Sequence, residues 1–225
     1  MKTAQLEQWR GEFGRAYTDR NSLSPTALDA LYRKNFGIAR SELNQRFLAG
    51  IPRDARILEV GCNEGNQLCA LREMGFRRIY GLEIQEYALR RARQRLESAQ
   101  LALATAFEIP YPDRFFDVVF TSGVLIHIAP ADLPRALREI HRCAGRFIWG
   151  HEYYSPQPVE VTYRGHKSLL WKADYARLYL DLFDDLDLVR AEQIPYLEDA
   201  NVDCMFLLSR QKPRSTPSRR DVQEA

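Results

Sequence analysis

Short apolar runs alternate with amphipathic stretches along most of this 225-residue chain. Apolar runs that contain β-branched residues and end in turn residues are typical of buried strands, whereas apolar positions at helical spacing indicate helices. The strands predicted in this way lie near 56–60, 78–84, 101–104, 116–120, 146–152, 186–190 and 204–209, and the helices near 64–74, 85–98, 131–144 and 171–182. Because strands and helices alternate, the pattern predicts an α/β fold whose last two strands form a hairpin.

The same pattern divides the chain into an extension, a central domain and a tail. Residues 1–50 are amphipathic and predict helices, with Ser24-Pro25-Thr26 as one helix start. Residues 51–210 hold all the predicted strands, interrupted at 153–172 by a long segment rich in tyrosine. Loops of that length usually have a function or are disordered, and its aromatic content favours a substrate lid. Residues 211–225, rich in Lys, Arg, Pro and Ser, predict a disordered tail.

A stretch inside the N-terminal region, residues 13–21, interrupts the helical pattern with glycine, aromatic and polar residues. Two interpretations stay open from composition. The stretch is either a lid segment over a bound cofactor, with Tyr17, Arg20 and Asn21 pointing inward, or a solvated loop.

The first predicted strand runs into a turn that contains Gly61 and Gly65 and then into a helix. Strand, glycine turn and helix together bring a nucleotide-like ligand against backbone N–H groups. A dinucleotide site would need G-x-G-x-x-G, which the chain lacks. The turn instead resembles the E/D-x-G-x-G-x-G motif of class I S-adenosylmethionine (SAM) methyltransferases, with Asn63 replacing the middle glycine; Asn tolerates left-handed backbone well. The residues expected to surround SAM here are Glu59, Gly61, Cys62, Asn63, Gly65 and Asn66.

Glu83 ends the second predicted strand, about 20 residues beyond the glycine turn, where a carboxylate that binds ribose is expected. The alternative is a helix N-cap or a surface acid. Further along, Ala106 and Phe107 follow the third strand, where an adenine ring would fit, and Thr105 stands where methyltransferases often place an Asp. The remaining residues expected near the cofactor are Ile84, Ser122 and Gly123.

Three residues are candidates for a general base. His127 follows the fourth strand at the carboxyl edge of the sheet, where ligands of such folds bind, although a lone His in an apolar stretch is often a packed core residue. Glu152 and Tyr153 end the fifth strand. The residues expected to bind the methyl acceptor are Tyr17, Tyr154, Tyr163, Arg164 and His166. Arg164 would pair with a substrate carboxylate, and Glu152 could instead hold an ammonium group.

Composition narrows the partners. The net charge of +2, from 32 basic and 30 acidic residues, gives no broad field for nucleic acid. We read the arginines at 90, 91, 93 and 95 as a solvated helix face. Four cysteines lack metal-binding spacing, so we expect buried free thiols and no metal. No apolar run is long enough to span a membrane and the first residues are no signal peptide, so we expect a cytoplasmic protein, as a monomer or homodimer.

Several of these stretches occur together in one group of proteins. Residues 10–210 resemble the class I methyltransferases known as pseudaminic acid biosynthesis-associated methylases, through 13–21, 58–66, 80–84, 116–128, 152–167 and 172–176. This resemblance implies a Rossmann-like, seven-stranded, mostly parallel sheet with helices on both faces, a last antiparallel strand, and SAM as the methyl donor, released as S-adenosylhomocysteine. It does not fix the acceptor, because one fold serves many substrates.

The expected function is therefore SAM-dependent methyl transfer to a nitrogen or oxygen of a small polar metabolite, such as an amino acid, an amino sugar or a natural-product intermediate. Three alternatives remain from the sequence: a methyltransferase that acts on tRNA or protein, a SAM-binding regulator without catalysis, and an NAD(P)-dependent reductase.

Overall fold

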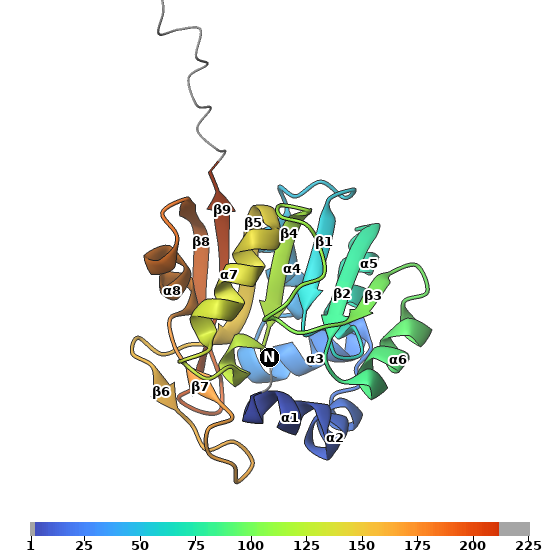
Figure 1. Ribbon diagram of the computed structural model, residues 1–225. Coiled ribbons are helices and arrows are strands. Elements are labelled where there is room, and N and C mark those ends of the chain that lie inside the picture. Colours follow the sequence, from blue (N-terminus) through green and yellow to red (C-terminus); the bar gives the residue numbers. More distant parts are fainter. Residues whose placement is uncertain (1–2, 212–225) are drawn as a thin grey trace, which may run out of the picture.

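The computed structural model describes residues 3–211. Seven strands form one sheet in the order β3-β2-β1-β4-β5-β9-β8, and β9 is antiparallel to both of its neighbours, β5 and β8 (Figure 1). The strands are β1 (Arg56–Val60), β2 (Arg78–Glu83), β3 (Gln100–Leu103), β4 (Phe116–Ser122), β5 (Ala144–Tyr153), β8 (Leu186–Pro195) and β9 (Val202–Arg210). The Rossmann-like, mostly parallel sheet expected from the sequence is confirmed.

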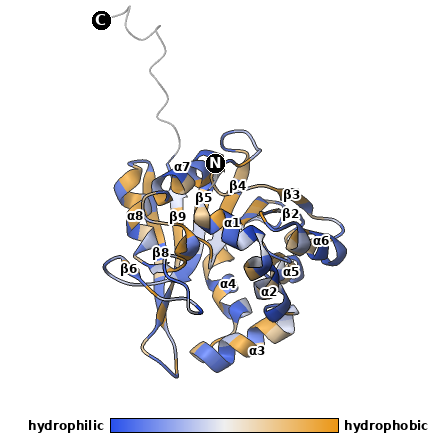
Figure 2. Ribbon diagram, turned by 60° about the horizontal axis from the view of Figure 1, so that its bottom comes forward, coloured by the Kyte–Doolittle hydropathy of each residue, from blue (hydrophilic) through white to orange (hydrophobic). Residues whose placement is uncertain are grey.

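Helices cover both faces of this sheet, which is why the central strands are apolar throughout (Figure 1). Strand β4 shows the consequence, because Val119 packs into one core and its neighbours Val118 and Phe120 pack into the other. The helices are α4 (Arg40–Leu48), α5 (Asn66–Glu73), α6 (Glu86–Arg95), α7 (Leu133–Cys143) and α8 (Tyr175–Leu182). Figure 2 shows hydrophobic residues on the central strands and a mostly hydrophilic α6.

The N-terminal region forms α1 (Ala4–Arg10), α2 (Glu12–Arg20) and α3 (Pro25–Phe36) before α4. The predicted start of α3 is confirmed: the Ser24 hydroxyl accepts a hydrogen bond from the Ala27 N–H, and Pro25 occupies the first turn. The break predicted at 13–21 is wrong, because most of this stretch is α2. Gly14 serves close packing there, since a Cβ would lie 1.8 Å from the Trp9 carbonyl oxygen.

The segment 153–172 has structure of its own. Strands β6 (Val159–Glu160) and β7 (Trp171–Lys172) pair antiparallel, and a tight turn joins Tyr163 to His166 between them. At the other end of the chain, the predicted tail at 211–225 lies outside the described residues except for Gln211. Within residues 3–211, no helix has the length and apolarity that crossing a bilayer requires.

Candidate active site

The glycine turn follows β1 at the carboxyl edge of the sheet. Its backbone is left-handed at Gly61 (φ +75°), Asn63 (φ +49°) and Gly65 (φ +82°), so the expectation that Asn63 adopts this conformation is confirmed. The N–H groups of Gly61 and Cys62 both donate to the Leu82 carbonyl at 2.8 Å, which fixes the turn against β2. A Cβ at Gly61 would lie 2.6 Å from the Val124 side chain, so this position has no room for any larger residue.

Glu83 ends β2 beside that turn and is buried. Its carboxylate accepts hydrogen bonds from the backbone N–H groups of Asn63 at 2.8 Å, Ile84 at 2.7 Å and Gln85 at 2.8 Å. Burial raises the pKa of Glu83, and these three donors oppose the rise. A carboxylate has about four lone-pair positions, so Glu83 retains capacity toward the cavity that it lines.

That cavity has a volume of about 340 Å³, within the range of small-molecule sites. Most of the predicted cofactor residues line it. They are Asn21, Glu59, Gly61, Cys62, Asn63, Asn66, Glu83, Ile84, Ala106, Phe107, Ser122 and Gly123. Two predicted residues do not: Gly65 packs under Leu96, and Arg20 is an exposed residue at the end of α2. Thr105 uses its hydroxyl to accept the Phe107 N–H at 3.2 Å, within its own turn.

Helices α1 and α2 cover this cavity, with Trp9 and Tyr17 among its lining residues. The pKa of Tyr17 is raised by burial, so its phenol stays protonated. Trp9 packs against the His127 ring with centroids 4.4 Å apart, and Phe13 packs edge-on against Tyr163 and His166. The N-terminal helices and the 153–172 segment therefore meet above the cavity through aromatic rings.

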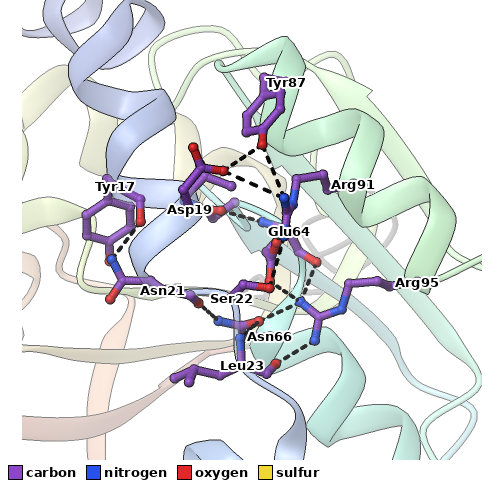
Figure 3. A network of polar contacts seen from close by, with 12 residues as sticks. Tyr17, Asp19, Asn21, Ser22, Leu23, Glu64, Asn66, Tyr87, Arg91 and Arg95 are labelled. Carbon is purple, nitrogen blue, oxygen red and sulfur yellow. Dashed lines mark hydrogen bonds and ion pairs between the residues drawn. The ribbon is translucent and has the colours of Figure 1, made fainter.

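A polar network joins the end of α2 to the glycine turn (Figure 3). The Asn66 amide donates to the Asn21 carbonyl at 2.7 Å, and the Arg95 guanidinium donates to the Leu23 carbonyl and to Asn66 Oδ1 at 2.6 Å each. Beneath it, the buried Glu64 carboxylate accepts from Arg91 at 2.7 Å and from Arg95 at 2.6 Å. The interpretation of the arginine run as a solvated face is thus wrong for Arg91 and Arg95.

The acceptor end of the cavity, as we call the part over the ends of β5 and β9, lies two and three strands from β1. It is formed by Tyr32, His127, His151, Glu152, Tyr153, Tyr163 and Asp203. His127 lies in the 3-10 helix η1 (Leu125–His127), and its Nδ1 is 2.7 Å from the Leu169 carbonyl. Because a carbonyl only accepts, Nδ1 carries the proton and Nε2 keeps a free lone pair. Burial lowers the pKa of His127 to about 4, which makes it a weak base.

Glu152 is buried, and its two carboxylate oxygens lie 3.2 Å from the Val124 N–H and 3.5 Å from the Ile126 N–H. These bonds hold the η1 turn against β5. Burial raises the pKa of Glu152 to about 7. The third candidate base, Tyr153, is half-buried at the acceptor end, and burial raises its pKa as well.

The predicted acceptor-binding residues separate into two groups. Tyr17 and Tyr163 line the cavity. Arg164 and His166 are exposed, and Tyr154 lies outside the lining. The tight turn between Tyr163 and His166 places Arg164 at its tip, exposed and outside the cavity lining, so the expected pairing with a substrate carboxylate has no support from its position.

Sequence reasoning missed a buried polar cluster below the acceptor end. Arg40 of α4 is fully buried and donates to the Tyr32 hydroxyl at 2.7 Å and to His151 Nδ1 at 2.9 Å. His151 Nε2 lies 3.4 Å from Asp203 Oδ2. The one available signal was the His151-Glu152 pair inside the apolar run of β5; Arg40 and Asp203 carry no motif.

The match with known proteins centres on the cofactor half of the structure. Residues 58–146 match the family model described as a methyltransferase domain. A 27-O-demethylrifamycin SV methyltransferase from Amycolatopsis mediterranei is 29% identical over 54% of this chain and 48% of its own length. A sterol 24-C-methyltransferase from Pneumocystis carinii is 31% identical over 47% of this chain and 29% of its own length. The chain thus spans about half or less of these curated relatives.

Solved structures agree on the fold. A 1,6-didemethyltoxoflavin-N1-methyltransferase from Burkholderia thailandensis, solved with S-adenosylhomocysteine, has a TM-score of 0.70 at 16% identity and covers 94% of this chain and 92% of its own. A SAM-dependent methyltransferase from Leishmania major has a TM-score of 0.69 at 17% identity, covering 92% and 87%. The fold is that of these SAM-dependent methyltransferases, and residues 58–146 match a methyltransferase domain. The cofactor of this class of enzyme is SAM.

The residues of the cavity fit that cofactor. Glu83 offers a buried acceptor for ribose hydroxyls, Ala106 and Phe107 offer an apolar slot, and Gly61 leaves space for close approach. All four cysteines are buried free thiols, as expected. Among residues 3–211, no group of three or more His, Cys, Asp or Glu side chains could hold a metal ion.

Proposed function

We propose that this chain is a SAM-dependent methyltransferase that acts on a nitrogen or oxygen of a small polar metabolite. The observation that carries the proposal is a single covered cavity that joins the glycine turn and Glu83 to an acceptor end rich in polar side chains. The cofactor fills the first part, with Arg20 and Gly65 outside contact, and the acceptor fills the second. The resemblance to pseudaminic acid biosynthesis-associated methylases is compatible with such an acceptor.

The residues of the acceptor end mainly supply position. The sulfonium already makes the methyl group electrophilic, so the protein must align the acceptor atom, the methyl carbon and the sulfur, and exclude water. Positioning of this kind contributes on the order of 7–11 kcal/mol to lowering a barrier. Trp9, His127 and Tyr163 pack together at the cover and exclude water. This cover favours a small acceptor over tRNA or protein, which would need an open surface.

Calorimetric titration with S-adenosylhomocysteine tests the cofactor half. We expect micromolar binding to the wild type and a loss of at least about tenfold in Glu83→Gln, since a charged acceptor of the ribose hydroxyls is replaced by a neutral one. Glu83→Ala removes the acceptor altogether and should bind more weakly still. Titration with NAD is the matched control for the reductase alternative. Binding of NAD without binding of S-adenosylhomocysteine would overturn the proposal.

Release of S-adenosylhomocysteine from SAM in the presence of small polar metabolites tests catalysis. Cofactor binding with no turnover on amino acids, amino sugars or macromolecular extracts would favour a SAM-binding regulator instead. Turnover on RNA that falls steeply with salt would favour the nucleic-acid alternative.

A further inference from the structure

The charged side chains that line the cavity are of one sign, because they are acids. Five carboxyl groups line it, and among residues 3–211 no Lys or Arg side chain does. These acids are Glu59, Glu83, Asp132, Glu152 and Asp203. The nearest buried cation, Arg40, lies behind the lining, where it bonds to Tyr32, Asn44 and His151. Burial raises the pKa of the four buried acids in this lining, and a bound cation opposes that rise by favouring their ionised forms. A cavity of this kind therefore stabilises ligands that carry positive charge.

Asp203 and Glu59 each keep one buried carboxylate oxygen without a partner, and of the two only Asp203 belongs to the acceptor end. The Asp203 side chain is only 7% exposed, and its Oδ1 is buried without a partner. Glu83 and Glu152, in contrast, accept several backbone N–H groups. A buried carboxylate oxygen without a donor costs free energy unless a ligand supplies one. Asp203 lines the acceptor end, so a donor on a ligand bound there would satisfy Oδ1.

The neighbours of Asp203 fix its orientation. Arg40 always carries its protons, so its 2.9 Å contact with His151 Nδ1 makes that nitrogen an acceptor and leaves the proton on Nε2. That N–H faces Asp203 Oδ2 at 3.4 Å. Burial and the Arg40 charge hold the pKa of His151 well below its usual range, so the imidazole stays neutral. The Tyr196 hydroxyl bonds to the Asp203 side chain, whereas the His151 N–H lies near Oδ2 without a hydrogen bond, so Oδ1 stays unpartnered.

Charged and polar groups from several elements set how readily Asp203 takes up a proton. Burial raises the pKa of Asp203 to about 7, and the charge of Glu152 adds to the rise. Arg40 of α4, Lys172 of β7 and the Tyr196 hydroxyl oppose it.

We propose that the methyl acceptor is a primary or secondary amine that enters as an ammonium ion and donates to Asp203 Oδ1. This inference rests on the proposed methyltransferase function and adds the chemical class of the acceptor. Tyr153 and Tyr163 provide aromatic rings at the same end of the cavity, and such rings attract cations. Lys172 Nζ already lies 5.4 Å from the centre of the Tyr153 ring, and the Arg164 guanidinium carbon lies 5.9 Å from that of Tyr163.

The reaction requires the neutral amine. One ammonium proton passes to the Asp203 carboxylate, the nitrogen lone pair forms the new C–N bond, and the C–S bond breaks with its electron pair going to sulfur. An aliphatic hydroxyl is about as weakly acidic as water, so it gives up a proton far less readily than an alkylammonium group does.

Matched probes separate amines from hydroxyl compounds. Benzylamine, benzyl alcohol and phenol are offered with SAM, as are D-glucosamine and D-glucose, and release of S-adenosylhomocysteine is measured. We expect kcat/KM for an amine to exceed that of its hydroxyl counterpart by at least about tenfold. Asp203→Asn keeps the side-chain size and should lower kcat/KM for the amine at least about tenfold. The affinity for S-adenosylhomocysteine should stay within about twofold in Asp203→Asn. Glu198→Gln, an equivalent change at an exposed position, is the control.

Three results would overturn the amine assignment: hydroxyl probes used as well as amines, unchanged amine kinetics in Asp203→Asn, or no amine used or bound by protein that binds S-adenosylhomocysteine. Loss of S-adenosylhomocysteine binding by the wild type is a different failure, because it rejects the methyltransferase function itself.

Discussion

Replacing Glu64 by Gln tests whether the polar network under the cavity cover stabilises the fold. The Glu64 side chain is 1% exposed and accepts charged hydrogen bonds from Arg91 and Arg95, whose side chains are 35% and 24% exposed. Gln has nearly the same volume but only one acceptor oxygen. One charged hydrogen bond is lost, and an amide N–H₂ group then faces a guanidinium.

The expected loss follows from those contacts. A hydrogen bond to a charged group contributes about 1.5–3 kcal/mol, and breaking a fully buried ion pair costs about 3–5 kcal/mol. Because both arginines reach solvent, we expect a value near the lower range, about 2–3 kcal/mol. For a chain of this size that corresponds to a fall in Tm of roughly 4–12 °C.

Urea unfolding followed by circular dichroism gives the free energy of unfolding of the variant. Glu86→Gln is the control, since Glu86 pairs with Arg90 on the same helix at 3.5 Å while both side chains are more than half exposed. Such a pair contributes less than about 0.5 kcal/mol. Equal losses in the two variants would show that burial of Glu64 adds nothing and would refute the reasoning.

Three further predictions follow from single contacts. Gly61→Ala should destabilise the fold by about 1–3 kcal/mol, measured by urea unfolding, since it combines left-handed strain with a clash against Val124; Gly123→Ala, where φ is +66° and space is open, should lose less. Trp9→Ala should speed dissociation of S-adenosylhomocysteine in stopped-flow experiments, whereas Trp9→Phe should retain the slow rate. For Glu152, the pKa is raised from 4.5 to about 7, so its contribution to stability is present below pH 4.5 and is lost as pH rises to about 7. Urea unfolding between pH 4 and pH 8 should show that Glu152→Gln reduces the pH-dependent fall in the free energy of unfolding by up to about 3 kcal/mol. An unchanged fall would contradict the prediction.

The sheet was predictable because its residues face apolar surroundings on both sides. Runs such as 56–60 and 116–120 are therefore rich in apolar residues, and this can be seen without knowing which other segments pack against them. The glycine turn was predictable for a related reason. Positive φ at Gly61 and Gly65 admits few other residues, and Asn63 is one of the few that tolerate it.

Two wrong interpretations share a physical cause: the type of a residue does not indicate which other residue it will contact. Gly14 looks like a helix breaker, but its missing Cβ allows α2 to pack against α1. Arg95 looks like a surface cation until Glu64, 31 positions earlier in the chain, is found beneath it. Arg164 has the right chemistry to bind a carboxylate and is exposed at the tip of a turn, so its role in binding stays a prediction. For Gly14 and Arg95, contacts with residues outside their own helix decided the outcome.

The two ends of the cavity draw on different parts of the chain, which explains why the cofactor was easier to assign than the acceptor. The matched segment 58–146 contains the glycine turn, Glu83, and the lining residues Ala106 and Phe107. His127 is the one residue of the acceptor end that this segment contributes. Tyr32 and Tyr163 come from the added helices and the 153–172 segment, and the other residues come from β5 and β9. Substitutions at the acceptor end can therefore change the acceptor while the residues of the matched segment that line the cofactor part of the cavity stay the same. The specificity of the chain accordingly has to be tested at Asp203 and its neighbours.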